Sequence, residues 1–193
     1  LPEIGLRWEG TAWRDEAARS RDFVLWLPAM RQTMIESFEI ERGTSLHPLP
    51  RRPRWLVLGD SITQGYVTAH PSQGYAALAA EAMGMEHVNA AVGGGVADPA
   101  LAELARGLPS ELATVALGVN DYARGTELDA FGRNVFDLLA GLRDALPDAR
   151  ILWITPISYV GHMRRRNKAG RFLKDYATVI GEQAARVPRI EVL

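Results

Sequence analysis

Short apolar runs alternate with helical periods along most of the chain. The clearest run is Trp-Leu-Val-Leu at residues 55–58, which lacks any polar side chain and predicts a strand buried on both faces. Four later runs predict further strands, at residues 87–91, 112–117, 151–154 and 189–193. The helical periods fall between them, at residues 74–83, 99–106, 128–146 and 169–185. Strands that alternate with helices of this length predict a parallel sheet with right-handed crossovers, in a three-layer α/β/α domain.

The first 50 residues have a different pattern. Residues 22–27 and 34–40 are strand-like, and the second of these stretches alternates apolar with acidic positions. Because two strands do not make a stable sheet alone, we expect them to pack on the main domain or to belong to an incomplete accessory β-domain. Residues 47–53 contain three prolines and read as a linker. We therefore predict a β-rich segment with its linker at 1–50 and an α/β domain at 51–193.

Composition narrows the classes of function. The formal net charge is −1, so nothing indicates binding to nucleic acid or to an anionic membrane. No apolar run approaches the roughly 20 residues of a membrane span, and no set of His, Glu and Asp residues has metal-ligand spacing. The chain has no cysteine, which fits a cytoplasmic as well as an exported protein. The opening residues do not form a signal peptide, and we favour the cytoplasm.

The first predicted strand stops sharply at Gly59-Asp60-Ser61. This turn places the Ser61 hydroxyl at the carboxyl end of the sheet, where open α/β sheets bind their ligands. Backbone N–H groups near Ser61 are then free to face a negative charge. A serine hydroxyl becomes a good nucleophile when a base removes its proton. The tetrahedral oxyanion that its attack creates needs preorganised hydrogen-bond donors. The alternative is a phosphate-binding turn.

Two further strand ends carry candidate donors. A glycine triplet at 93–95 follows the second predicted strand, and taken alone it reads as a flexible turn. The third predicted strand is followed by Gly118-Val-Asn120-Asp121, at the same sheet edge as Ser61. An amide such as that of Asn120 is a neutral donor with no proton to lose. The alternative is that Asn120 and Asp121 cap the next helix.

As a set, the three turns resemble signature blocks of the SGNH (GDSL-type) hydrolases. The heptad Gly-Asp-Ser-Ile-Thr-Gln-Gly that contains Ser61 resembles the first block, in which the serine is the nucleophile. The resemblance implies that Gly94, with Gly93 as the next match, and Asn120 help to form the oxyanion hole together with the Ser61 N–H. It covers about residues 55–193 and implies a flavodoxin-like three-layer fold.

The resemblance also implies a function. The expected activity is a serine ester hydrolase that forms an acyl-enzyme intermediate, needs no cofactor and prefers short, acetyl-type esters, with carbohydrate esters as candidates. The alternatives are a thioesterase or lysophospholipase of the same fold, and a ligand-binding module that lacks the base. Some members carry a jelly-roll-like β-sandwich ahead of the catalytic domain, which residues 1–50 resemble. The expected partner is a small-molecule or carbohydrate ester, and the oligomeric state stays open.

The fourth block of the family, Asp-x-x-His, does not occur in the 193 residues. None of the four histidines, His47, His70, His87 and His162, has an aspartate three positions earlier. We expect the catalytic aspartate and histidine beyond Leu193, and the alternative is a variant without a base.

Several other residues could contact a substrate: Asp60, Gly93, Asp121, Tyr122 and His162. For Asp60, shaping the turn is favoured over acting as a base, and for Tyr122 packing in the core is the alternative. The cations at residues 164–168 predict a solvated loop, with a lid or a contact to a polar substrate as alternatives.

Overall fold

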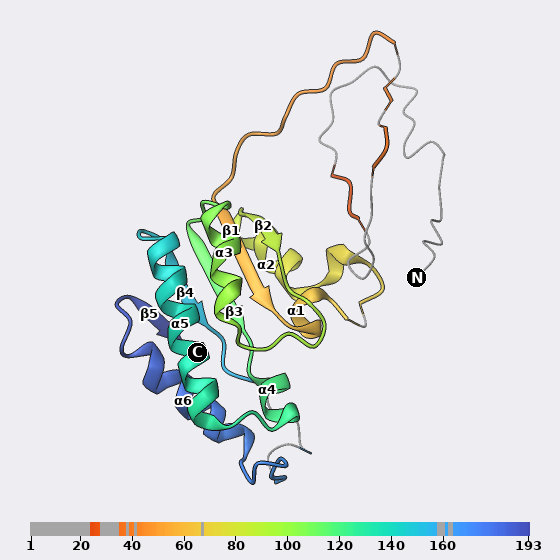
Figure 1. Ribbon diagram of the computed structural model, residues 1–193. Coiled ribbons are helices and arrows are strands. Elements are labelled where there is room, and N and C mark those ends of the chain that lie inside the picture. Colours follow the sequence, from red (N-terminus) through yellow and green to blue (C-terminus); the bar gives the residue numbers. More distant parts are fainter. Residues whose placement is uncertain are drawn as a thin grey trace.

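One parallel sheet forms the centre of the computed structural model (Figure 1). The structure describes residues 24–27, 35–37, 39–40, 42–66, 68–157, 161 and 164–193. Within these residues five strands pair in the order β2-β1-β3-β4-β5, all of them parallel. They are β1 (Arg54–Gly59), β2 (Glu86–Asn89), β3 (Leu112–Ala116), β4 (Arg150–Trp153) and β5 (Ile190–Val192). This order confirms the predicted flavodoxin-like fold.

The longer helices lie close to the predicted positions. They are α2 (Tyr75–Met83), α3 (Ala102–Arg106), α5 (Leu128–Ala145) and α6 (Leu173–Ala184), and short 3₁₀ turns, η1 (Pro71–Gln73) and η2 (Pro99–Leu101), precede α2 and α3. Two further helices directly follow β1 and β3, and the sequence pattern did not predict them. These are α1 (Ser61–Gln64) and α4 (Val119–Arg124), which are too short to show an apolar period.

Helix α5 covers one face of the sheet. Its fully buried apolar residues recur at helical spacing: Phe131, Val135, Leu138, Leu139 and Leu142. Helices α3 and α6 pack beside it. The contact with α3 is close at Gly141, where an added Cβ would lie 2.7 Å from the Cβ of Ala102. The largest hydrophobic core lies between these helices and the sheet.

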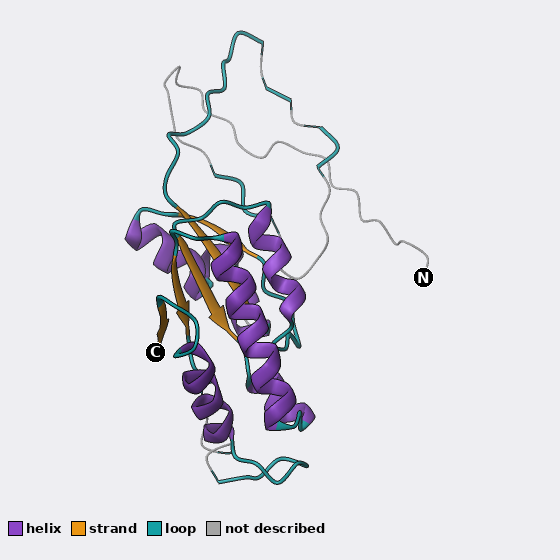
Figure 2. Cartoon of the chain, turned by 60° about the vertical axis from the view of Figure 1, so that its left-hand side comes forward, coloured by secondary structure: helices purple, strands orange, loops and turns teal. Residues whose placement is uncertain are grey.

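Helix α2 packs on the opposite face, so helices lie on both sides of the sheet (Figure 2). Ala76 and Ala80 of α2 contact Trp55 and Val57 of β1. Alternate residues of β1 therefore point to opposite faces, as in any strand, and both faces are buried as the apolar run predicted.

The N-terminal part is described only in pieces. Residues 24–27, 35–37 and 39–40 form no strand, and the other residues of the two predicted strands lie outside the described residues. Residues 42–53 are exposed and lead into β1 (Figure 1). The division into a β-rich segment and an α/β domain at residue 51 stays a prediction.

Candidate active site

Ser61 is the first residue of α1, immediately beyond the end of β1. Asp60 caps this helix, because its carboxylate accepts a hydrogen bond from the Ile62 N–H at 2.9 Å. The Ser61 N–H lies in the first turn, where helices have no internal acceptor. The Ser61 hydroxyl makes no hydrogen bond to any described residue. Within the described part of the chain, the hydroxyl is therefore available at the carboxyl edge of the sheet.

The loop after β2 lies against α1. The Gly93 N–H donates to Oε1 of Gln64 at 2.8 Å, and a Cβ added at Gly93 would lie 3.9 Å from the Cβ of Ser61. The Gly94 carbonyl accepts a hydrogen bond from Arg124 at 2.7 Å. The Gly94 N–H has no hydrogen-bond acceptor among the described residues. Of the two glycines, Gly94 is thus the one with a free donor.

Asn120 links the three turns. Its Nδ2 donates to the Gly95 carbonyl at 3.0 Å and to Oδ2 of Asp60 at 3.3 Å. The helix that carries Asn120 begins after Gly118, whose φ of +122° suits only glycine and where a Cβ would lie 2.8 Å from Pro156. The loops after β1, β2 and β3 therefore meet at one edge of the sheet, beside the point where the strand order reverses.

Two carboxyl groups are buried in this region. Asp60 is 4% exposed and Asp121 is 1% exposed. Burial raises the pKa of Asp60, and it raises the pKa of Asp121 to about 6. Asp121 accepts a hydrogen bond from the Ala97 N–H at 3.2 Å. Asp121 therefore holds the loop that follows β2.

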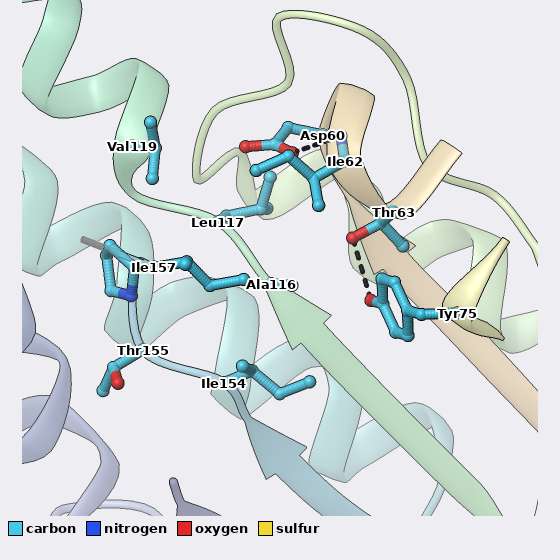
Figure 3. Close-up of a pocket in the computed structure, with 11 residues that line it drawn as sticks. Asp60, Ile62, Thr63, Tyr75, Ala116, Leu117, Val119, Ile154, Thr155 and Ile157 are labelled. Carbon is cyan, nitrogen blue, oxygen red and sulfur yellow. Dashed lines mark hydrogen bonds between the residues drawn. The ribbon is translucent and has the colours of Figure 1, made fainter. Parts of the chain in front are cut away.

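An apolar cavity of about 250 Å³ opens beside the Asp60 turn (Figure 3). The first turn and α2 contribute Asp60, Ile62, Thr63 and Tyr75, and the hydroxyls of Thr63 and Tyr75 are hydrogen-bonded at 2.9 Å. The other lining residues stand at or after the ends of β3 and β4: Ala116, Leu117, Val119, Ile154, Thr155, Pro156 and Ile157. Asp60 and Ile62, the neighbours of Ser61 in the sequence, line the cavity, but Ser61 does not.

The remaining predicted contact residues are Tyr122 and His162. Tyr122 is 4% exposed, packs edge-on against Tyr176 at 5.9 Å between ring centroids, and donates its hydroxyl to the Arg165 carbonyl at 2.9 Å. This position is typical of core packing, and Tyr122 is not among the residues that line the cavity. His162 lies outside the described residues.

The three described histidines do not bond to Ser61. His47 lies in the exposed linker, and His70 is the residue before η1. His87 belongs to β2, its ring lies 5.8 Å from that of Trp26, and burial lowers its pKa. None of the three donates to or accepts from the Ser61 hydroxyl.

Gln64, Arg124 and residues 154–157, directly after β4, contribute to the candidate site and were not predicted from the sequence. Gln64 stands in the heptad, and Arg124 follows Asn120 by one helical turn, so both positions carried a signal. Their partners depend on loop conformation. For the residues after β4, the sequence signal was Thr155-Pro156, which ends the predicted strand at the same edge of the sheet.

Within the described part of the chain, no three His, Asp or Glu side chains are grouped so that they could hold a metal ion. The described helices include none with the length and apolarity of a membrane span.

Solved structures share this fold at low sequence identity. The salicylyl-acyltransferase SsfX3 from a tetracycline biosynthetic pathway is 22% identical, with a TM-score of 0.69 over 76% of this chain and 43% of its own. TesA is 23% identical, with a TM-score of 0.59 over 69% of this chain and 73% of its own. The third structure is a carbohydrate esterase family 2 enzyme with a carbohydrate binding domain, from Corynascus thermopiles (Myceliophthora fergusii). It is 16% identical, with a TM-score of 0.62 over 77% of this chain and 58% of its own. These identities show the fold alone.

The chain spans less than half of the acyltransferase. A search of curated proteins finds no match. The model of the GDSL-like lipase/acylhydrolase family matches residues 57–193. The matched stretch begins inside β1 and includes all three turns around Ser61. The chain therefore belongs to the GDSL-like lipase/acylhydrolase family.

Proposed function

We propose that this chain is a serine ester hydrolase in which Ser61 attacks the carbonyl carbon of the substrate. The observation that carries the proposal is the position of Asn120. Its side-chain amide donates hydrogen bonds to Asp60, in the turn after β1, and to Gly95, in the turn after β2. Turns from three strands thus meet beside a serine hydroxyl that makes no hydrogen bond to the described residues. Membership of an acylhydrolase family supports an acyl ester as the substrate class.

In this proposal the Ser61 Oγ forms a bond to the carbonyl carbon and gives its proton to a base. The Ser61 N–H and the Gly94 N–H stabilise the oxyanion, and Asn120 joins them when its longer bond to Asp60 is exchanged for one to the substrate. The alcohol then leaves with a proton, and water hydrolyses the acyl ester on Ser61 to release the acid. Each such donor stabilises the transition state by roughly 2.7–4 kcal/mol.

The base is not assigned to any described residue. None of the described histidines bonds to Ser61, and the Asp60 carboxylate already accepts from Ile62 and Asn120. This observation favours a second candidate function, a module that binds an ester or acid in the pocket without turnover.

For the substrate, we propose short, acetyl-type esters, including those of carbohydrates. The support is the resemblance of the three turns to the hydrolase family, and the apolar cavity beside Asp60 is the candidate site for the acyl group. A thioester is the alternative, because the same donors stabilise the oxyanion formed from it. Hydrolysis rates of p-nitrophenyl acetate and of a long-chain p-nitrophenyl ester distinguish the acyl preferences. Faster hydrolysis of the long chain contradicts the proposal.

Labelling with a fluorophosphonate tests the role of Ser61. We expect a covalent adduct on Ser61, identified by mass spectrometry, and we expect Ser61→Ala to lose the adduct while its thermal unfolding is unchanged. Ser72→Ala is the matched control and keeps the adduct. An adduct on another serine removes Ser61 from the mechanism. Absence of both adduct and turnover, with ligand binding retained, favours the binding module.

A further inference from the structure

Cations are concentrated in one short stretch of the chain. Residues 164–174, here called the basic segment, carry six cationic side chains and no acidic one: Arg164, Arg165, Arg166, Lys168, Arg171 and Lys174. All six are exposed, and no ion pair joins any of them to a described carboxylate. The whole chain has a net charge of −1. The segment is therefore a local excess of positive charge that forms no ion pair with a described carboxylate.

The backbone of the basic segment is fixed by Asn167. Its Nδ2 donates to the Tyr122 carbonyl at 3.0 Å and to the Tyr176 hydroxyl at 2.9 Å. Its Oδ1 accepts from the N–H groups of Ala169 at 3.0 Å and Arg171 at 2.9 Å. These bonds fix the backbone around Asn167, which distinguishes the segment from an unstructured run of charges.

Asn167 also attaches the segment to α4, the helix that carries Asn120. The side chain of Lys168 lies over the end of that helix, so that a Cβ added at Gly125 would meet it at 2.6 Å. Arg124 of the same helix holds the Gly94 carbonyl. In Figure 1 the segment, drawn in blue, lies next to α4 at the end of the molecule toward which the strands point. The cations therefore stand on the same edge of the sheet as Ser61.

We propose that the basic segment is an anion subsite, which binds a phosphate-bearing part of a small soluble substrate at a distance from the scissile ester. This inference rests on the proposed function. Exposed cations without carboxylate partners create a positive potential that attracts anions to a site and orients them. Four of the six are arginines, whose planar forks bind phosphate oxygens in pairs. The substrate then carries its negative charge on the portion that leaves or extends beyond the acyl group.

Binding of coenzyme A and of pantetheine, measured by calorimetry, tests the subsite. The two probes share a thiol arm, but only coenzyme A carries phosphates. We expect coenzyme A to bind at least about tenfold more tightly, with the difference shrinking as salt is added. The combined variant Arg164→Gln, Arg165→Gln and Lys168→Gln should remove the difference. Arg166 and Lys174 are left in place because they pack on the ring of Phe172.

The matched control is Arg51→Gln with Arg52→Gln, a pair of exposed arginines before the amino end of β1. It should keep the preference for coenzyme A, as should Ser61→Ala. Equal binding of the two probes, or an equal loss in the control, overturns the subsite. Binding to phosphatidylglycerol vesicles through the same residues, without a preference for coenzyme A, overturns it in favour of a lipid surface. Failure of the serine to label removes the hydrolase and leaves this binding test unaffected.

Discussion

Asn120 holds Gly95 by the shorter of its two hydrogen bonds and Asp60 by the longer one. An oxyanion that replaces the longer bond leaves the cap of α1 intact, because Asp60 still accepts from Ile62. We expect Asn120→Ala to slow labelling of Ser61 by a fluorophosphonate about 10²–10³-fold, the usual effect of removing one oxyanion donor. Asn134→Ala, in α5, is the control and should label at the normal rate. An unchanged rate in Asn120→Ala contradicts the oxyanion role.

Asp121 makes stability depend on pH. Burial raises its pKa from 3.8 to about 6, so the folded protein holds the proton more tightly than the unfolded chain. Its stabilising contribution is present in full below about pH 4 and is lost as the pH rises through 6. This difference corresponds to on the order of 3 kcal/mol in the free energy of unfolding.

Asp121→Asn keeps an acceptor for the Ala97 N–H but cannot titrate. Urea unfolding between about pH 4 and pH 7 should show the variant gaining stability relative to the wild type as the pH rises. A difference in unfolding free energy that is independent of pH contradicts the assignment.

At the scale of elements, the contact between α3 and α5 depends on a residue without a side chain. Gly141→Ala should lower the free energy of unfolding by about 1–3 kcal/mol, because the new methyl group meets Ala102 and neither backbone can yield easily. Gly181→Ala in α6 meets nothing within 4 Å, and it should raise stability by about 0.5–1 kcal/mol. Chemical denaturation of the two variants checks both signs, and a stabilising Gly141→Ala refutes this packing account.

The long elements were predictable because burial imposes a period on them. The run at 55–58 is buried on both faces, and α5 places its apolar residues on one side over its whole length. The helices α1 and α4 have four and six residues, so no period can emerge, and their positions follow from capping by Asp60 and from the glycine before Val119. The convergence of the turns at one edge could be predicted, because parallel strands end on the same side of a sheet. The contacts of Gln64 and Arg124 could not be predicted, since they depend on loop conformation.

At the scale of the whole molecule, we expect residues 51–193 to fold without the preceding part of the chain. This range contains every described strand and helix and both hydrophobic clusters. The fragment should show cooperative unfolding with a midpoint close to that of the full chain, as measured by circular dichroism. A fragment 61–193, which lacks the central strand β1, should not fold. Loss of cooperative unfolding in 51–193 would place the domain boundary earlier.

The register between β1 and β3 has a consequence for how such a protein can change. Gly59 and Ala116 are paired across the two strands. Ser61 closely follows Gly59 in the chain, and Asn120 closely follows Ala116. Their separation is the spacing of neighbouring strands, roughly 4.8 Å, and no peripheral loop sets it. Segments grafted between Thr155 and Leu173 can therefore alter which molecules are recognised, while the sheet keeps the reactive groups aligned. Such a scaffold is open to redesign at its rim and rigid at its centre.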